Sequence, residues 1–301
     1  MNYLLLGGAG FIGTHLARRL LEAGHKVTII DNLSTSEMPE DFSYFHQQDI
    51  RDGGPILDFF IEKSDVVYFL AASVGVQHID KDPKGTLENN IELIQAVIPL
   101  LEKYNKKCIF ASSSEVYGDG PFLEDGNLSI GNPQVLRWGY AAAKLTTEFM
   151  IAASSFPFII ARFFNIVGPG QLPDYGMVLP NFIKAIKNKE DLIVHGDGKQ
   201  VRSFCHVKDA VDFLLQLEYN NSKEFPIYNI GNDQPITIKQ LAEKVIELSD
   251  SSCKLSMTPY KEVFSENTKD INYRVPDLTK LRRNIMYAPK YSLDDIIKDM
   301  L

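Results

Sequence analysis

Short apolar runs alternate with amphipathic segments through the first half of the chain. Each run is rich in Val, Ile, Leu or Phe, and the segment after it repeats its apolar residues at helical spacing. This alternation predicts parallel strands joined by crossover helices, because a strand that is covered on both faces is apolar on both. We therefore expect an α/β fold with a doubly wound parallel sheet of the Rossmann type. The strands predicted for it are Tyr3–Leu6, Lys26–Ile30, Val66–Leu70, Cys108–Ala111 and Phe158–Arg162.

The pattern changes near Pro169. Gly and Pro become denser, the predicted strands Leu192–His195 and Ile227–Ile230 are short, and the helices are separated by irregular loops. We expect a Rossmann domain over residues 1–168 and a smaller mixed α/β lobe over residues 169–301. The boundary is soft, because no linker or repeat marks it and a later segment can cross back to the first domain.

Composition and charge narrow the classes of protein. The 301 residues are 45% hydrophobic and 23% charged, which is typical of a globular chain. The net charge of -8 argues against non-specific binding to nucleic acid or to an anionic membrane. Three scattered cysteines, no signal peptide and no membrane-length apolar run predict a cytoplasmic protein. The histidines form no cluster with carboxylates at ligand spacing, so we predict no metal site.

A glycine-rich turn joins the first predicted strand to the helix predicted over Ile12–Ala23. Gly7, Gly10 and Gly13 have the spacing GxxGxxG. Without side chains the backbone can turn tightly, approach a pyrophosphate and present amides at a helix N-terminus. The motif predicts a dinucleotide site, whereas a plain glycine turn between strand and helix is the less favoured interpretation.

Asp31 ends the next predicted strand and favours NAD over NADP. A carboxylate there can accept hydrogen bonds from the ribose hydroxyls, and it would repel a 2′-phosphate. The segment Asp49–Asp52 follows a third strand end, where it either reaches the adenine or forms a solvated charged turn. The other cofactor contacts that we predict are Gly7, Gly10, Phe11, Ile12, Gly13, Asn32, Asp49, Ile50, Leu70, Ala71 and Ala72.

Tyr140 and Lys144 are candidates for acid–base chemistry. Their i, i+4 spacing, at the start of a predicted helix, puts both side chains on one face. A phenol needs a lowered pKa to act as a base, and a neighbouring ammonium group and a positively charged nicotinamide would both lower it. The spacing alone is weak evidence for a catalytic site, because such pairs are common on helix surfaces. It is stronger evidence here because the strand end Ser112–Glu115 can supply a hydroxyl that polarises a substrate oxygen.

Several motifs together resemble the extended short-chain dehydrogenase/reductase family, and specifically its nucleotide-sugar epimerases, dehydratases and decarboxylases. They occur in the family's order, from Met1 to Leu301: GGAGFIG, DNLS, LAA, SSSEVYG, YAAAK, ARFFNIVGP, HGDGKQVRSF and RVPD. The resemblance implies that a hydride moves from sugar C4 to tightly held NAD and usually returns. It makes Tyr140 the base, gives Ser113 a hydrogen bond to the sugar O4, and puts Lys144 on the nicotinamide ribose.

The resemblance also assigns the substrate side. Asn165, Arg202 and Arg274 match positions that hold the nucleotide diphosphate, and Asp277 matches one near the nucleoside ribose. His195 stands where the family often has a ring stacked on the base, so it is either a stacking residue or a surface residue. Val74 and Ser114 are further predicted substrate contacts. Family members commonly pair through two helices, here near Thr86–Lys103 and Tyr140–Ser154, so we expect a homodimer.

Three reactions remain open after a 4-keto sugar has formed. The family's 4,6-dehydratases have an Asp where this chain has Ser114, and a hydroxyl is a far poorer proton donor. UDP-glucuronate decarboxylases usually read Thr-Ser-Glu there, and Ser113-Ser114-Glu115 comes close. The separate segment Arg137-Trp138-Gly139-Tyr140 also resembles some decarboxylases. The segments Ala72–Val76 and Tyr175–Pro180 resemble 4-epimerases instead.

The favoured prediction is an NAD-dependent 4-epimerase of a UDP-linked sugar. A decarboxylase or an unusual dehydratase is the alternative. Glu115 is catalytic in the alternatives and can be a bystander in an epimerase. A non-catalytic dinucleotide-binding protein is disfavoured, because such proteins typically lack the Tyr140–Lys144 pair.

Overall fold

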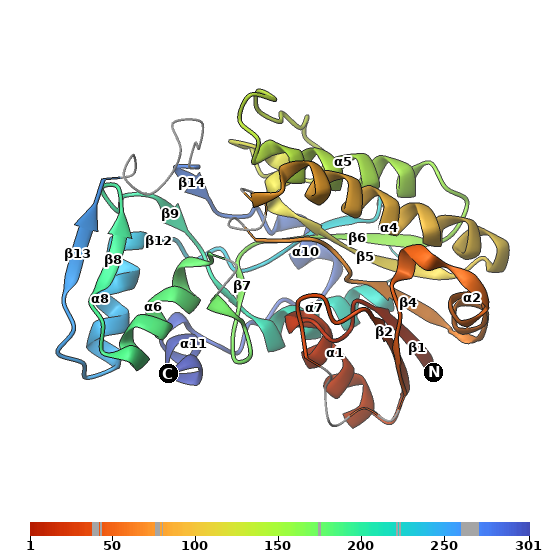
Figure 1. The fold of residues 1–301 in the computed structure, drawn as a ribbon, viewed down its shortest axis with the longest axis horizontal. Coiled ribbons are helices and arrows are strands. Elements are labelled where there is room, and N and C mark those ends of the chain that lie inside the picture. The colour runs from red at the N-terminus through yellow and green to blue at the C-terminus, as the bar shows by residue number, and fades with distance from the viewer. Residues whose placement is uncertain are drawn as a thin grey trace.

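The chain folds into two parts, one built on a large sheet and one built on short strands and helices (Figure 1). This computed structural model describes residues 1–37, 42, 44–75, 79, 81–173, 176–220, 222, 224–259 and 271–301. Val76 and Tyr175, which belong to the epimerase-like segments, lie outside the described residues. The N-terminus lies in the larger part, and the C-terminus lies beside the smaller one.

Seven parallel strands form the large sheet in the order β11-β6-β5-β4-β1-β2-β3. The strand order reverses beside β1, which is the switch point of a doubly wound sheet. The predicted fold class is therefore confirmed. The strands are β1 (Asn2–Leu6), β2 (Lys26–Asp31), β3 (Phe45–Gln47), β4 (Val66–Phe69), β5 (Lys107–Ser113), β6 (Phe158–Phe163) and β11 (Ile227–Ile230).

Helices cover both faces of this sheet, which explains why its strands are apolar throughout. In β1, Tyr3 and Leu5 belong to one hydrophobic core, whereas Leu4 and Leu6 belong to another on the opposite face. The first face is covered by α1 (Phe11–Glu22), α7 (Val207–Glu218) and α10 (Thr279–Asn284). The second is covered by α2 (Gly54–Lys63), α4 (Pro83–Tyr104) and α5 (Trp138–Ala152), of which α4 and α5 lie above the sheet in Figure 1.

The smaller part has its own core, formed where three helices pack against a two-stranded parallel sheet. The helices are α6 (Val178–Asn188), α8 (Ile238–Leu248) and α11 (Leu293–Met300), and the strands are β8 (Leu192–His195) and β13 (Leu255–Thr258). Two small sheets complete the fold, made by β7 (Ile166–Val167), β9 (Val201–Arg202), β10 (Cys205–His206), β12 (Ile236–Thr237) and β14 (Tyr273–Arg274).

The chain returns to the large sheet after residue 168. Both α7 and β11 come from the second half of the sequence, yet they pack on the sheet or extend it. The division into an NAD-binding domain over residues 1–168 and a substrate-binding lobe over residues 169–301 therefore stays a prediction. No helix in the described part of the chain is long and apolar enough to cross a membrane.

Three elements differ from their predicted bounds by two residues or more at one end or both. The strand β5 continues to Ser113, because Ser112 and Ser113 still pair with Arg162 and Phe163 of β6 through backbone groups. Helix α5 begins at Trp138, so Tyr140 lies inside its first turn. Helix α4 begins at Pro83, because Asp82 accepts a hydrogen bond from the Gly85 amide and caps that end. Two short 3-10 helices, Ile50–Asp52 and Ser114–Tyr117, follow β3 and β5.

Candidate active site

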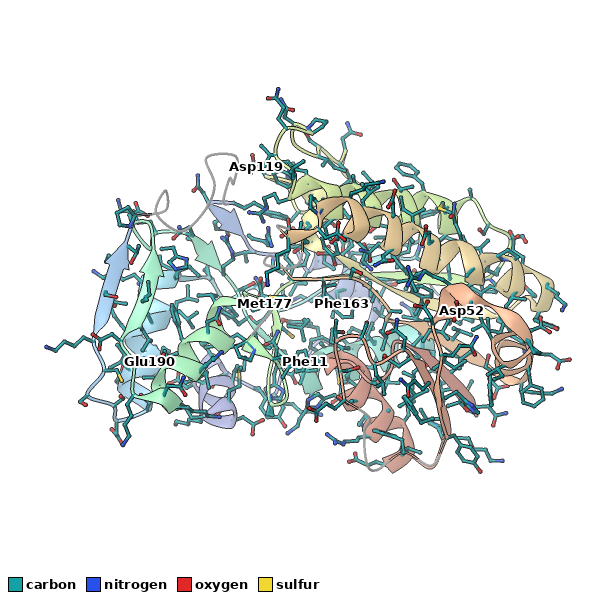
Figure 2. All side chains as sticks on the ribbon, in the orientation of Figure 1. Phe11, Asp52, Asp119, Phe163, Met177 and Glu190 are labelled. Carbon is teal, nitrogen blue, oxygen red and sulfur yellow. The ribbon has the colours of Figure 1, made fainter. Side chains whose placement is uncertain are left out.

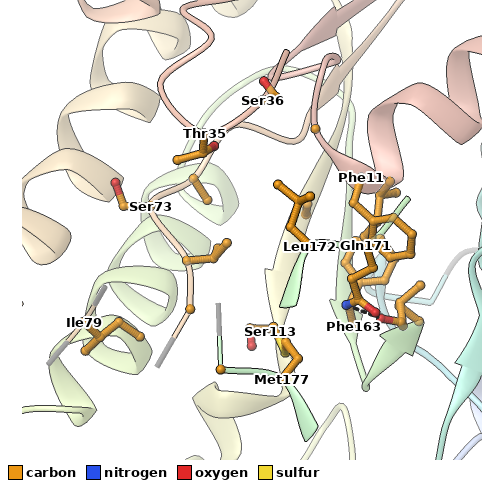
Figure 3. A pocket seen from close by; sticks show the side chains of 18 of the residues that line it. Phe11, Thr35, Ser36, Ser73, Ile79, Ser113, Phe163, Gln171, Leu172 and Met177 are labelled. Atoms are coloured by element: carbon orange, nitrogen blue, oxygen red, sulfur yellow. Dashed lines mark hydrogen bonds between the residues drawn. The ribbon is translucent and has the colours of Figure 1, made fainter. Parts of the chain in front are cut away.

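A cavity of about 1530 Å³ lies beyond the carboxyl ends of the central strands and extends to the smaller part. Figure 2 labels residues around it, with Phe11 and Phe163 beside the large sheet, Met177 at the join and Glu190 in the smaller part. Every site residue predicted from the sequence lines this cavity except Asp277. Figure 3 shows Phe11, Ser73, Ser113 and Met177, from four separate segments, around the same pocket.

The glycine turn fits a pyrophosphate. A side chain on Gly7 would put its Cβ 2.4 Å from the Ala71 nitrogen, and one on Gly13 would lie 2.5 Å from the Gly8 oxygen. Both glycines are therefore required where the strand, the turn and α1 approach closely. Gly10 is the N-cap of α1, has no side chain to cap its amides, and lines the cavity. Those amides are left for an anionic ligand.

Asp31 and Asp49 lie at the end of the cavity beside β2. The Asp31 carboxylate accepts hydrogen bonds from the amides of Ala9 (3.0 Å) and Leu33 (2.9 Å). Asp49 pairs with Arg51 at 2.7 Å and accepts a hydrogen bond from Asn32. Hydrogen bonds from Arg51 hold the pKa of Asp49 well below its ordinary value. The segment Asp49–Asp52 is thus both a charged turn and part of the cavity wall.

Tyr140 and Lys144 project from α5 toward the end of β5, and both are buried, with 8% and 3% of their surface exposed. Tyr140 shares a hydrogen bond with Ser113. The Lys144 ammonium donates a hydrogen bond to the Ala111 carbonyl at 2.9 Å. Burial lowers the pKa of Lys144 to about 7, although the nearby Glu148 carboxylate opposes that shift.

The electrostatics of Tyr140 correct one expectation. Burial and the charge of Glu115 raise the pKa of Tyr140 above its ordinary value, and the hydrogen bond with Ser113 only partly opposes them. The predicted lowering by Lys144 is therefore wrong for the protein's own groups. The physical reason is that Lys144 is itself buried, so its charged form is penalised as well.

Glu115 is clamped between two arginines, which argues against a bystander role. Its carboxylate lies 2.7 Å from Arg274 Nη1 and 3.3 Å from Arg137 Nη2, and only 17% of its side chain is exposed. Burial alone would raise the pKa of Glu115, but Arg274, Arg137 and Arg202 outweigh burial and lower it. Glu115 is therefore ionised at neutral pH.

The sequence did not mark Arg137 as a site residue, although its motif beside Tyr140 was the available signal. Arg274 was expected at the diphosphate, and the structure places its Nη1 atom 2.7 Å from the Glu115 carboxylate. Its Nε and Nη2 atoms are buried and have no hydrogen-bond partner among the described residues. Two unpartnered nitrogens on one guanidinium suit an anionic oxygen ligand.

The remaining predicted residues are divided between the cavity and its surroundings. Asn165 and Arg202 line the cavity, and each also donates a side-chain hydrogen bond to a backbone carbonyl. His195, at the end of β8, is half-buried and lines the cavity too. Asp277 does not line it; its carboxylate accepts a hydrogen bond from the Thr279 amide at 2.8 Å. Its predicted ribose contact therefore has no support in the placement of its side chain.

The sequence also did not indicate a buried ion pair that lies behind Lys144. Arg162 of β6 donates to Glu148 of α5 at 2.6 Å, and Ser112 donates to the same carboxylate. Both charged side chains are nearly inaccessible, at 3% and 4% exposure. The pair fixes α5 against the sheet one turn beyond Lys144. Nothing local in the sequence pairs these residues, because they meet only after the sheet has formed.

The sequence pattern of the NAD dependent epimerase/dehydratase family matches residues 3–231. The chain belongs to this family. NAD is therefore the cofactor of this protein, and the glycine turn, the uncapped helix end and Asp31 are the residues placed to hold it. A structure similar to this chain has been solved with NAD bound.

Two relatives and one solved structure cover nearly the whole chain. UDP-N-acetyl-alpha-D-glucosaminuronate decarboxylase of Bacillus cytotoxicus is 35% identical over 99% of this chain and 96% of its own length. UDP-glucuronic acid decarboxylase 4 of Arabidopsis thaliana is 31% identical over 97% of this chain, which spans only 66% of that longer relative. UDP-glucuronic acid 4-epimerase from Bacillus cereus, solved with UDP-glucuronic acid and NAD, is 26% identical, with a TM-score of 0.84 and coverage of 100% and 98%.

Proposed function

We propose that this protein is a decarboxylase of a UDP-linked hexuronate, with glucuronate or its 2-acetamido counterpart as the sugar. One observation carries the proposal: an ionised carboxylate, Glu115, is held between two arginines directly beside the Ser113–Tyr140 pair. That charged cluster lies where the sugar carbons next to C4 would be, if Ser113 and Tyr140 bind the oxygen on C4.

The cluster supports decarboxylation over the other two reactions. A 4,6-dehydratase must protonate a departing hydroxyl, but Glu115 is ionised and its neighbour Ser114 is a buried hydroxyl. A 4-epimerase of a neutral hexose changes only C4 and has no charge at C6, so it needs no charged cluster beside C5 and C6. Decarboxylation breaks the C5–C6 bond, and there fixed charges can orient the carboxylate.

The reaction follows from these residues. The phenolate of Tyr140 would be favoured by the charged form of Lys144 and by the positive nicotinamide of bound NAD. As a phenolate, Tyr140 accepts the proton of the C4 hydroxyl while Ser113 holds its oxygen. When bound, NAD supplies the hydride acceptor for C4 and later returns the hydride. The C4 ketone makes the C6 carboxylate part of a β-keto acid, so the C5–C6 electron pair passes into an enolate as CO2 leaves. Ser113 and the protonated Tyr140 stabilise the enolate oxygen. A solvent proton is then added to C5, and Tyr140 returns its proton to the C4 oxygen.

The named relatives support the same choice. Both curated relatives described above are decarboxylases of UDP-linked uronates. The solved structure acts on UDP-glucuronic acid too, but by inverting C4. The 4-epimerase reaction favoured on the sequence alone therefore has less support than its alternative.

The reaction can be tested by product analysis in deuterated water. The protein is incubated with UDP-glucuronate, UDP-N-acetylglucosaminuronate and UDP-glucose, and the products are followed by mass spectrometry and proton NMR. We expect CO2 loss from a uronate, solvent deuterium at C5 and no change in UDP-glucose. Tyr140→Phe is the control for catalysis by this site.

Two results would contradict the proposal. A product of unchanged mass with inverted C4 and no deuterium would restore the epimerase, and loss of water would indicate a dehydratase. Glu115→Gln separates these cases further. A decarboxylase that uses this carboxylate should lose turnover, whereas an epimerase should keep most of it.

A further inference from the structure

Arg137 lies where the sugar end of the substrate would be bound. It is the N-cap of α5, three residues before Tyr140, and it lines the cavity beside Glu115. Only 11% of its side chain is exposed. A guanidinium that is buried in a catalytic cavity, rather than exposed at its rim, has a strong requirement for oxygen ligands.

The two arginines hold Glu115 unequally. Arg274 approaches one carboxylate oxygen to 2.7 Å, which is the normal length of a charge-assisted hydrogen bond. Arg137 reaches the two oxygens through the single nitrogen Nη2, at 3.3 and 3.4 Å. Arg274 is therefore the main partner of Glu115. A shift of Arg137 toward another anion would therefore leave Glu115 paired with Arg274.

A uronate substrate would bring a second carboxylate close to Glu115. Ser113 and Tyr140 mark the position of the C4 oxygen, and C6 is only two carbons from C4. The charge of Glu115 is already felt at Tyr140, whose pKa it raises. Two carboxylates at this place would repel each other unless a cation lies between them. Arg137 is the cation whose contact with Glu115 is loose enough to be shared.

We propose that Arg137 is a specificity-determining residue that binds the C6 carboxylate of the nucleotide hexuronate while Arg274 keeps Glu115 in place. The proposal rests on the uronate substrate proposed above. A neutral hexose has no anionic group at C6, so it gains nothing from Arg137. The residue therefore discriminates between a uronate and the corresponding hexose.

Binding measurements can test this without turnover. The Tyr140→Phe variant with saturating NAD is titrated with UDP-glucuronate and with UDP-glucose by calorimetry, with and without Arg137→Met. We expect Arg137→Met to weaken UDP-glucuronate by about 10-fold to 100-fold, as for loss of a charge-assisted hydrogen bond, and UDP-glucose by less than about 3-fold. Arg137→Lys keeps the positive charge but not the paired N–H donors of a guanidinium, so it should recover part of the lost affinity for UDP-glucuronate.

Arg202→Met is the matched control. It removes a guanidinium from the same cavity, and it should weaken both ligands alike if Arg202 holds the diphosphate. Equal weakening of both ligands by Arg137→Met, or no weakening of either, would overturn the proposal. Retained UDP-glucose binding and an unchanged melting temperature show that the variant is folded.

The two proposals can fail separately. If the enzyme inverts UDP-glucuronate at C4 without losing CO2, and Arg137→Met still weakens UDP-glucuronate selectively, the decarboxylase assignment is wrong and the role of Arg137 stands. If Arg137→Met releases CO2 from UDP-glucuronate with unchanged kcat and KM, the role of Arg137 is wrong and the decarboxylase stands.

Discussion

Lys144 provides a sharp test of the electrostatics of the site. It is 3% exposed, and its ammonium donates to the Ala111 carbonyl. Burial lowers the pKa of Lys144 from 10.5 to about 7. The substitution Lys144→Met keeps a similar length of side chain and removes the titrating group. The free energy of unfolding of the two proteins should therefore depend differently on pH.

The sign follows from proton counting. Above pH 7 the folded protein begins to release the Lys144 proton, whereas the unfolded chain keeps it up to about pH 10.5. The unfolded state binds more protons in that window, so the stability that Lys144 contributes increases as the pH rises. Each pH unit well inside the window adds about 1.4 kcal/mol. Between pH 6 and pH 9 the difference between wild type and Lys144→Met should shift by about 2.7 kcal/mol in favour of wild type.

The assay is urea unfolding of both proteins, freed of nucleotide, at intervals from pH 6 to pH 9. The matched control is Lys84→Met, which removes a lysine with 83% of its side chain exposed and is measured over the same pH range. Constant offsets, such as loss of the hydrogen bond to Ala111, cancel in the pH dependence. A Lys144→Met difference that does not change with pH would refute the reasoning, because Lys144 would then titrate alike in the folded and unfolded chains.

Three further predictions concern cofactor, catalysis and assembly. Asp31→Ala should weaken NAD and reduce discrimination against NADP, because the carboxylate that would repel the 2′-phosphate is lost; equal NAD and NADP affinities in the wild type, measured by calorimetry, would contradict this. Tyr140→Phe should lower turnover by about 100-fold to 10,000-fold while the protein still folds and binds NAD, and near-normal turnover would require another base. If α4 and α5 form a homodimer interface, Phe149→Glu, at a side chain that is 68% exposed on α5, should give a monomeric mass by light scattering where the wild type gives a dimer.

The sequence by itself determined the large sheet and the dinucleotide turn. Parallel strands between two layers of helices are apolar on both faces, so short apolar runs such as Tyr3–Leu6 can be recognised as strands from the sequence. The glycine spacing is also a local pattern, and Gly13 is required by its contact with the nearby Gly8 backbone. The close approach of Gly7 to Ala71, in contrast, is visible only in the tertiary structure. Helical geometry puts Tyr140 and Lys144 on one face, and their spacing indicated a site only together with the glycine motif and the strand end Ser112–Glu115. Each of these patterns depends on residues a few positions apart, where backbone periodicity fixes the arrangement.

Only the tertiary structure decided the electrostatics of the site. Glu115, Arg137 and Arg274 come from three distant segments, and they meet only because β5, α5 and β14 surround one cavity. Charge interactions depend on distance in space and on burial, and neither has a sequence period. The lowered pKa of Lys144 could not be predicted from the sequence for the same reason, because it results from burial. It also decided that β11 joins the large sheet, since strand pairing across the chain is set by the whole packed core.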